Sequence, residues 1–224
     1  MDYTVRDLDT YKRKQHFKYF SGLAFPYVGT TAPVDITALM EKIRREGLPF
    51  FLTFCYCAAR AANRVPEFRR RVLNGGIVEY ARCRTSHTVA LEDETYCYCT
   101  LESAMPFAEY LPYAKREQER AKAARSIEQE RAKAARSIEE DAADTGDLLF
   151  ISTLPWLSYT ALVQPVPAPA DSNPRITWGR FYAEEEKTLL PVSVLCNHAL
   201  VDGLHIAAFY RRIEAEMAAL CAQP

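Results

Sequence analysis

The sequence predicts an α/β domain of two layers, in which helices cover a mixed, mostly antiparallel sheet. Segments rich in β-branched residues follow one another as hairpins do, instead of alternating one by one with helices. No strand leads into a glycine-rich loop of the kind that opens a parallel nucleotide-binding sheet. The length of 224 residues, 49% of them hydrophobic, suits a single domain over the whole chain, 1–224.

Helices dominate the first third of the chain. An amphipathic segment around Arg13, His16 and Phe17 predicts a first helix, and the glycines and prolines of residues 20–31 predict an irregular stretch. Residues 35–37 then cap a helix that reaches about Glu46, because apolar side chains recur there at helical spacing. Residues 50–65 predict another, strongly apolar helix.

The middle of the chain predicts three strands and the longest helix. Alternating or β-rich residues mark strands at 77–83, 87–91 and 95–101, after a basic segment at 68–73. His87 opens the second of these strands, and we expect it to be structural. Pro106 opens a long helix that ends at the turn of residues 144–147.

An unchanged duplication lies inside the long helix. Residues 118–128 recur without a difference as residues 129–139. Eleven residues lengthen a helix by about 16 Å and rotate its face by only about 20°. Each copy consists mostly of strong helix formers and has a single large apolar residue. We expect a solvated helix extension at 118–139, of recent or engineered origin and without a catalytic role.

The second half of the chain predicts a series of strands closed by a helix. We expect strands at 148–151, at about 157–163, at 175–182 and from Thr188 to Cys196, with a hairpin turn at 183–187 before the last one. Apolar residues at helical spacing then predict a terminal helix. They are Phe209, Ile213, Met217 and Leu220.

A histidine stands where the last strand ends. The apolar run stops at Asn197-His198, and Asp202-Gly203 follows as a sharp turn. Imidazole titrates near neutral pH, which suits a general base held by a rigid strand. A lone histidine after a strand is more often structural, and Asp-Gly is usually only a turn, so both interpretations stay open on these residues alone.

Composition limits the classes of partner. The net charge of −1 gives no argument for nucleic acid or for an anionic membrane surface, and no apolar run could span a bilayer. The charged start of the chain does not look like a signal peptide. None of the seven cysteines has the CxxC spacing of a zinc site. We therefore expect no metal, and buried thiols in the reducing cytoplasm.

Three motifs resemble those of one enzyme family. They are the terminal His198-x-x-x-Asp202-Gly203, the earlier Ser152-x-Leu-Pro-Trp, and the two basic residues before His16-Phe17. In this order they resemble the chloramphenicol acetyltransferases. Motifs similar to the first one occur in dihydrolipoyl acyltransferase and peptide-synthetase condensation domains. Many members have a histidine where this chain has Asn197.

The resemblance implies a role for each motif residue. His198 would be the general base, and Asp202 would be structural, bound by Arg13. Ser152 would donate a hydrogen bond to the oxyanion of the tetrahedral intermediate, and Thr177 would hold a water near the same oxyanion. Taken alone, Ser152 is more simply a turn residue, and Thr177 a strand residue without a task.

The resemblance also implies co-substrate and assembly. The co-substrate would be acetyl-CoA, which would enter beside the strand 175–182, with Arg180 and Phe181 as candidates for contacting it. The protein would be a homotrimer with active sites at subunit interfaces, where His198 faces a pocket built partly by the neighbour. Its self-association and a small acceptor alcohol are the only partners we expect.

The acceptor is the open question. In the family the drug pocket uses segments that correspond to residues 20–28 and 157–164. Four residues there, Ala24, Pro26, Val28 and Gln164, differ from those usual in chloramphenicol-modifying members. From the resemblance we expect chloramphenicol or a similar small alcohol as the acceptor. The alternatives are a homologue with a different acceptor alcohol, a dihydrolipoyl acyltransferase core, which the Ser-x-Leu-Pro-Trp motif disfavours, and a non-catalytic trimeric binding protein.

Overall fold

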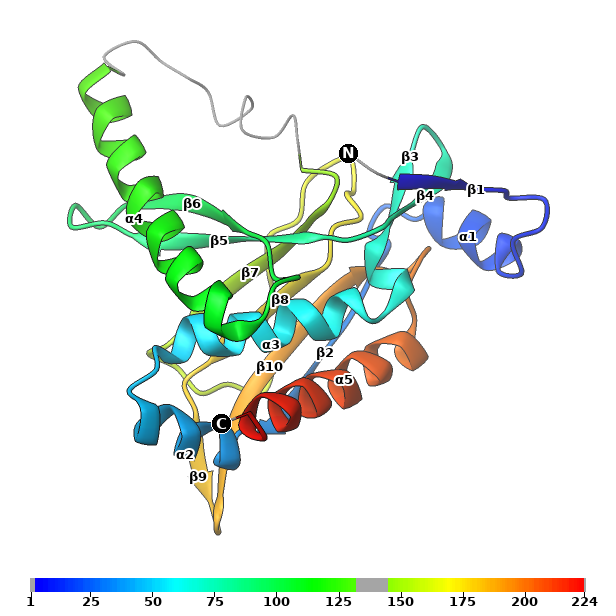
Figure 1. The fold of residues 1–224 in the computed structure, drawn as a ribbon. Coiled ribbons are helices and arrows are strands. Elements are labelled where there is room, and N and C mark those ends of the chain that lie inside the picture. Colours follow the sequence, from blue (N-terminus) through cyan, green and yellow to red (C-terminus); the bar gives the residue numbers. More distant parts are fainter. Residues whose placement is uncertain (1–2, 132–144, 224) are drawn as a thin grey trace.

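The computed structural model describes residues 3–131 and 145–223, and it sets one large sheet against a layer of helices (Figure 1). The helices are α1 (Lys14–Ser21), α2 (Thr37–Glu46), α3 (Phe50–Asn63), α4 (Phe107–Arg131) and α5 (Gly203–Cys221), with a 3-10 turn at Pro66–Arg69. The large sheet contains β2 (Tyr27–Asp35), β5 (Arg84–Ala90), β6 (Tyr96–Leu101), β7 (Leu148–Leu154), β8 (Arg175–Gly179), β9 (Tyr182–Glu184) and β10 (Lys187–Asn197).

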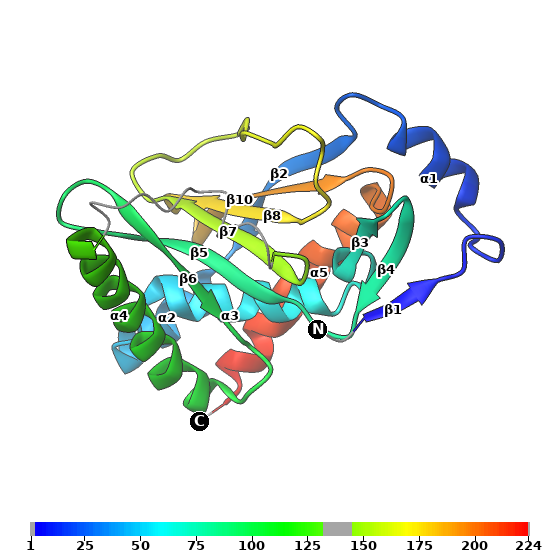
Figure 2. The same ribbon diagram turned by 90° about the horizontal axis from the view of Figure 1, so that it is seen from above.

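The order of the strands confirms the predicted fold class. The large sheet runs β2-β10-β8-β7-β5-β6, and β9 extends the pairing of β10. Only β5 with β7 and β7 with β8 are parallel, while the other pairs of this sheet are antiparallel. The sheet is therefore mixed and mostly antiparallel. In Figure 2, α3 and α5 lie on one side of the strands, and the loop of residues 155–174 passes over the other side.

The hydrophobic core fills the space between the sheet and α3 and α5. Trp178 of β8 meets Phe54 of α3 edge to face, with ring centroids 4.9 Å apart. Phe209 of α5 stacks on Phe68 at 5.5 Å. Alternate residues of β10 face the helices and are at most 2% exposed. They are Leu190, Val192, Val194 and Cys196.

The stretch of residues 20–31, predicted to be irregular, contains the start of strand β2, so that prediction was wrong. Gly22, Pro26 and Gly29 misled it, because glycine and proline are both rare inside strands. β2 is an edge strand, so the missing N–H of a proline does not break a hydrogen bond between two central strands. Pro33 pairs in register with Pro191 of β10. A Cβ on Gly29 would lie 2.5 Å from the carbonyl oxygen of Val194, so the close approach of β10 requires glycine here.

A second, separate sheet of three strands was not predicted, although one of its strands matches the strand expected at 77–83. β1 (Tyr3–Arg6), β4 (Gly76–Tyr80) and β3 (Arg70–Leu73) pair antiparallel in that order. The basic segment 68–73 was not predicted to be a strand because its charges hide the pattern. Glu79 of β4 is 9% exposed and accepts hydrogen bonds from Arg6 at 2.6 Å and from Arg70 at 2.9 Å. Cross-strand ion pairs therefore add to the apolar contacts of this sheet, such as that between Tyr3 and Tyr80.

The predicted strand at 157–163 is absent, and these residues belong to the loop 155–174. The chain turns at once after β7, since the N–H of Leu157 donates to the carbonyl of Leu154 at 3.1 Å. The C-terminal ends of β7 and β8 also differ from the predicted ends of these strands. β7 continues through Ser152, and β8 ends at Gly179, so Arg180 and Phe181 lie between β8 and β9 instead of inside a strand.

The long helix α4 contains the whole first copy of the duplication and ends, in the described part, at Arg131. Its first turns are core, because Tyr110 and Ala114 are fully buried. The rest of the second copy, and with it the prediction of a helix extension there, lies outside the described residues.

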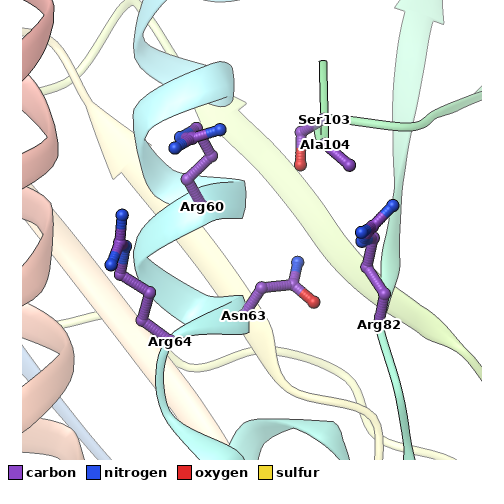
Figure 3. A pocket seen from close by; sticks show the side chains of 6 residues that line it. All are labelled: Arg60, Asn63, Arg64, Arg82, Ser103 and Ala104. Atoms are coloured by element: carbon purple, nitrogen blue, oxygen red, sulfur yellow. The ribbon is translucent and has the colours of Figure 1, made fainter. Parts of the chain in front are cut away.

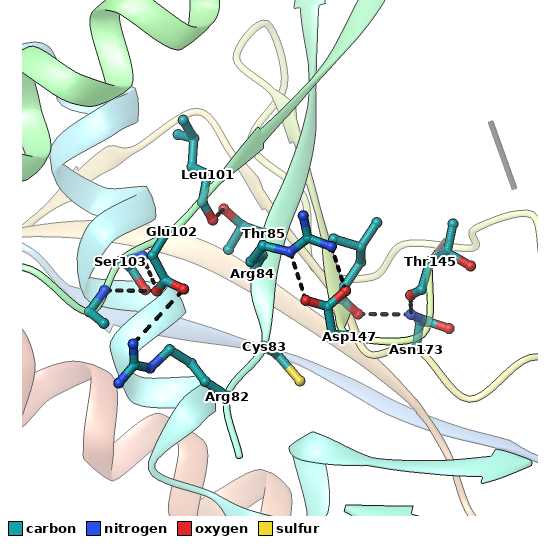
Figure 4. A network of polar contacts seen from close by, with 12 residues as sticks. Arg82, Cys83, Arg84, Thr85, Leu101, Glu102, Ser103, Thr145, Asp147 and Asn173 are labelled. Atoms are coloured by element: carbon teal, nitrogen blue, oxygen red, sulfur yellow. Dashed lines mark hydrogen bonds and ion pairs between the residues drawn. The ribbon is translucent and has the colours of Figure 1, made fainter. Parts of the chain in front are cut away.

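Polar contacts fix the start of β7 (Figure 4). Arg84 of β5 holds Asp147 through two hydrogen bonds of 2.7 and 2.8 Å. Asn173 donates to the carbonyls of Thr145 and Leu148 at 2.7 and 2.8 Å. These bonds join β7 to its neighbours β5 and β8 and thereby set the register that places Ser152.

Candidate active site

The turn from His198 to Asp202 is fixed by backbone hydrogen bonds. It leaves β10 where the N–H of His198 donates to the carbonyl of Pro26 at 2.7 Å. The N–H groups of Leu200 and Val201 both donate to the carbonyl of Asn197, at 3.1 and 3.0 Å. Helix α5 then begins with Asp202 as its N-cap, whose carboxylate accepts from the Leu204 N–H at 2.9 Å.

The imidazole of His198 is held in one tautomer. Its Nδ1 lies 2.7 Å from the carbonyl oxygen of Val201. A carbonyl can only accept, so Nδ1 carries the proton and Nε2 keeps a free lone pair. The half-buried ring packs on Phe20, with centroids 3.9 Å apart, and against His16 at 5.0 Å. This arrangement leaves Nε2 able to take a proton.

Arg13 and Asp202 are in contact, as the resemblance implied. The guanidinium Nη1 lies 2.5 Å from the Asp202 carboxylate, and the two side chains are 24% and 30% exposed. Partial burial raises the pKa of Asp202, but the hydrogen bond from Arg13 and the positive charge of its guanidinium outweigh it, so this pKa lies below its usual value. The carboxylate that caps α5 therefore stays charged.

His16 closes the turn from the side of α1. Its Nε2 lies 2.5 Å from the carbonyl oxygen of His198 and 3.0 Å from Nη2 of Arg13. A single ring nitrogen cannot donate to a carbonyl and accept from a guanidinium at the same time. The contact with the His198 carbonyl is the shorter of the two, so Nε2 of His16 donates to that carbonyl. Burial lowers the pKa of His16, which favours the neutral ring.

Asn197 has a structural task that sequence reasoning left open. The side chain is 5% exposed, its Oδ1 accepts from the Ala199 N–H at 3.0 Å, and its Nδ2 donates to the carbonyl of Asp171 at 2.9 Å. It thereby joins the turn to the loop before β8. An amide supplies both a donor and an acceptor without a charge, which suits this buried place.

Ser152 and Thr177 lie side by side in a row of hydroxyl groups on the sheet face away from the helices. Ser152 of β7 pairs with Thr177 of β8, Thr177 with Ser193 of β10, and Ser193 with Thr31 of β2. The hydroxyls of Thr31 and Ser193 are 2.6 Å apart. Thr177 is 2% exposed, and its Oγ1 has no hydrogen-bond partner among the described residues. Such a buried hydroxyl suits a bound water or ligand oxygen.

His198 lies far from this row within one chain. It follows Ser193 by five residues along β10, and Ser152 is two strands away. These steps correspond to roughly 16 Å along the strands and about 10 Å across them. A histidine side chain cannot span that distance, so a single chain does not bring His198 and Ser152 together.

A cavity of about 320 Å³ lies on the same sheet face, under the loop 155–174. Both segments expected to form the acceptor pocket, 20–28 and 157–164, contribute to it. Of the four residues singled out in those segments, Gln164 lines the cavity, and Ala24, Pro26 and Val28 are not among its lining residues. Its walls mix apolar side chains with hydroxyls; they include Phe25, Tyr27, Thr31, Thr160, Leu162 and Ser193.

The two residues expected to contact CoA lie between β8 and β9. The backbone N–H of Arg180 donates to the carbonyl of Leu157 at 2.7 Å, which fixes this bend to the loop. Phe181 is 39% exposed, and its ring lies 5.8 Å from that of Phe50. Both side chains reach the surface, but they lie apart from the His198 turn in the chain's own fold.

A second hollow of about 210 Å³ lies on the helix side and carries three arginines (Figure 3). Two of them, Arg60 and Arg64, bind the carboxylate of Glu216, which is 8% exposed. The third, Arg82, lies 4.0 Å from Glu102. These arginines neutralise acidic side chains, so the hollow is explained without a ligand. Its lining residues are Arg60, Asn63, Arg64, Arg82, Ser103 and Ala104.

The described residues contain neither a group of metal-ligating side chains nor a membrane-spanning helix. Within residues 3–131 and 145–223, no three His, Cys, Asp or Glu side chains come together as a metal ion requires. None of the helices described is both long enough and apolar enough to cross a membrane.

Comparison with known proteins points to one family. The family model described as chloramphenicol acetyltransferase matches residues 1–214. A chloramphenicol acetyltransferase from Klebsiella sp is 26% identical over 214 residues, covering 95% of this chain and 92% of that protein. Chloramphenicol acetyltransferase 2 from Escherichia coli is 27% identical over 217 residues, covering 96% of each.

Solved structures share the fold. A chloramphenicol acetyltransferase matches with a TM-score of 0.79 and 22% identity over 96% of this chain and 100% of its own. The cubic core of the pyruvate dehydrogenase multienzyme complex matches with a TM-score of 0.61 and 19% identity over 91% and 86%. Since the family model spans nearly the whole sequence, this chain belongs to the chloramphenicol acetyltransferase family, a family of acyltransferases.

Proposed function

We propose that the protein transfers the acetyl group of acetyl-CoA to a hydroxyl of chloramphenicol or of a similar small acceptor. The observation that supports this most is the geometry of His198. Its Nδ1 is bound by the Val201 carbonyl at 2.7 Å, which leaves Nε2 free to act as a base. The relatives named above, which carry the name of this activity, match over nearly the same length.

The proposed chemistry assigns one proton to His198. Its Nε2 removes the proton of the acceptor hydroxyl, and the oxygen attacks the thioester carbonyl of acetyl-CoA. Ser152 donates a hydrogen bond to the oxyanion that forms, and Thr177 assists through a water. The imidazolium then returns the proton to the departing CoA thiolate. No step in this scheme requires a metal.

Arg13 and Asp202 support the base without touching the substrate. Their hydrogen-bonded ion pair joins α1 to the N-terminus of α5, on either side of the turn that presents His198. A guanidinium and a carboxylate suit this task because their geometry is fixed and their charges persist near neutral pH.

We also propose that the protein is a homotrimer with its active sites between subunits. The separation of His198 from Ser152 within one chain supports it, because the reaction needs both groups within a few ångströms of one carbonyl. The exposed sheet face with Ser152 and the cavity of about 320 Å³ would receive His198 of a neighbouring copy. Acetyl-CoA would reach this site past Arg180 and Phe181.

Six of the seven cysteines are buried, which fits the reducing cytoplasm.

A thiol-release assay tests this function. Acetyl-CoA is incubated with the protein and a panel of alcohols that includes chloramphenicol, and the free CoA thiol is measured. We expect acceptor-dependent release, and about 10²- to 10⁴-fold less of it in His198→Ala, whose oligomer stays intact. A response to other alcohols alone would indicate a different acceptor. Release by the variant at the wild-type rate would exclude His198 as the base.

A further inference from the structure

One peptide group lies between two histidine rings. The carbonyl oxygen of Val201 is 2.7 Å from Nδ1 of His198, and the N–H of Asp202 donates to Nδ1 of His205 at 3.1 Å. This carbonyl and this N–H belong to the same planar peptide, so its orientation is fixed from both ends. His205 is the third residue of α5, where it closes a capping box with Asp202.

The partners of His205 determine its tautomer. Nδ1 of His205 lies 3.1 Å from the Asp202 nitrogen and 3.0 Å from Oδ1 of the Asp202 carboxylate. That Oδ1 already accepts from the Leu204 N–H, whereas the Asp202 N–H has its hydrogen bond to Nδ1. An N–H can only donate, so Nδ1 accepts and the ring proton sits on Nε2. That side faces the carboxylate of Glu67, with Nε2 3.6 Å from Oε1. Glu67 is itself held by Arg70, at 2.8 Å. The acceptor nitrogen therefore points to the peptide and the donor nitrogen to a fixed anion.

The charges around His205 leave the ring neutral. Burial lowers its pKa, the carboxylates of Glu67 and Asp202 raise it, and the guanidinium groups of Arg13 and Arg70 lower it, with a net decrease. The side chain is only 13% exposed. A neutral ring is what the contact with the Asp202 N–H requires, since a protonated Nδ1 could not accept.

We propose that His205 is a positioning residue that fixes the tautomer of His198 through the Val201–Asp202 peptide. Its ring keeps the N–H of that peptide turned toward α5, and the carbonyl is thereby kept turned toward Nδ1 of His198. If the peptide rotated, Nδ1 would lose its acceptor, and the proton could sit on Nε2 instead. The ring could then no longer act as a base. This proposal rests on the proposed function of His198.

The test compares three variants with the wild type. His205→Phe keeps a ring of similar size but removes the acceptor. His205→Gln restores an acceptor, and glutamine is a usual residue at this capping-box position. Phe209→Leu weakens the buried contact of α5 with Phe68 and leaves the peptide untouched, so it controls for loss of stability alone. The chain has only four histidines, which makes ¹⁵N NMR of their rings practicable.

The first readout is the tautomer, and it does not depend on activity. We expect the wild-type spectrum to show His198 protonated on Nδ1 and His205 protonated on Nε2. In His205→Phe the His198 signal should move toward the Nε2-protonated form, and in His205→Gln it should stay. A wild-type His205 protonated on Nδ1 would overturn the proposal even if the Phe variant failed to fold.

The second readout is kinetic. His205→Phe should lower kcat by about 10- to 100-fold with little change in the KM for acetyl-CoA, which is typical when an outer hydrogen-bond partner is removed. His205→Gln should recover most of kcat, and Phe209→Leu should lower the melting temperature but keep kcat. The proposal fails if the Phe variant keeps both kcat and tautomer, or if the Gln variant is as impaired as Phe. A wild type without transferase activity would refute the proposed function instead.

Discussion

At the scale of single residues, the geometry of the candidate site depends on hydrogen bonds that fix the orientation of its side chains. His198 is bound through its Nδ1 and its carbonyl, Asp202 through Arg13, and Asn197 through two backbone partners. His198, Asp202 and Arg13 could be predicted because their spacing forms a motif. The role of His205 could not, because a histidine rarely takes the capping-box position at which glutamate and glutamine are usual.

Arg13 and Asp202 should behave as one unit. Each side chain is about one-quarter to one-third exposed, so either substitution leaves a partly buried charge without its partner. We expect Arg13→Met and Asp202→Asn each to lower stability and kcat, and the double variant to lose much less than the sum. A double-mutant cycle on both quantities measures this coupling. Additive effects would mean that the contact does not matter for either.

His87 should make the stability of the protein depend on pH. The ring is 1% exposed, and burial lowers its pKa from 6.5 to about 4. Below about pH 6.5, His87 binds a proton in the unfolded chain but not in the folded chain. The contribution of neutral His87 to the free energy of unfolding is therefore fully present above pH 6.5 and is lost as the pH falls toward 4. At about 1.4 kcal/mol per pKa unit, the loss is on the order of 3 kcal/mol.

Urea unfolding at pH 7.5 and 4.5, at one protein concentration, measures this loss. His87→Gln removes the titrating group, while His16 and His205, whose pKa values also lie below normal, remain in both proteins. The difference between variant and wild type therefore isolates His87. An equal decrease in both proteins would show that His87 does not titrate in this window.

At the scale of elements, the sequence predicted helices better than strands. α2 and α5 are apolar on one face, α3 is apolar nearly all round, and all three helices lie where the sequence predicted them. β2 was missed, because its Gly29 is explained only by the close approach of the neighbour β10. The strand expected at 157–163 was wrong, because an apolar run can also form a loop that covers a sheet. Strand pairing depends on partners far away in the chain, which local patterns do not contain.

The first copy of the duplication is anchored where it begins. The amide nitrogen of Gln118 lies 3.0 Å from Nε2 of His87, so the ring accepts there. Removing residues 118–128 or 129–139 gives the same sequence, and glutamine stays at position 118 in both cases. The contact with His87 is therefore retained when one copy is deleted.

Deletion of one copy should accordingly leave the enzyme almost unchanged. Eleven residues keep the helix face within about 20°, so the anchored turns of α4 need not rotate. We expect the same oligomer, the same kcat and a free energy of unfolding within about 1 kcal/mol of the full chain. Size-exclusion chromatography, the thiol-release assay and urea unfolding check these three quantities. A loss of assembly or activity would assign the copy a structural role.

At the scale of the whole molecule, the separation of the site residues has the largest consequence. The motifs identified His198 and Ser152, but only the register of β10, β8 and β7 shows that one chain keeps them apart. A local motif cannot give this distance, because it depends on which strands are neighbours. The same register places Thr177 beside Ser152, which supports a shared task for these two hydroxyls.

Mixed oligomers test whether two chains complete one site. His198→Ala removes the proposed base, and Ser152→Ala removes the proposed oxyanion donor, for which we expect about 10²- to 10³-fold lower kcat. If each site takes His198 from one subunit and Ser152 from another, oligomers that contain both variants hold some sites with neither substitution. Co-expression with two different affinity tags and purification through both should then recover a substantial fraction of wild-type kcat, about one site in three for a trimer. Sites formed within single chains would instead leave every mixed oligomer as inactive as its parents, since each chain would carry one of the two defects. Mixing the separately purified homo-oligomers without subunit exchange provides the control, because no new interface forms there and activity should stay at the level of the variants.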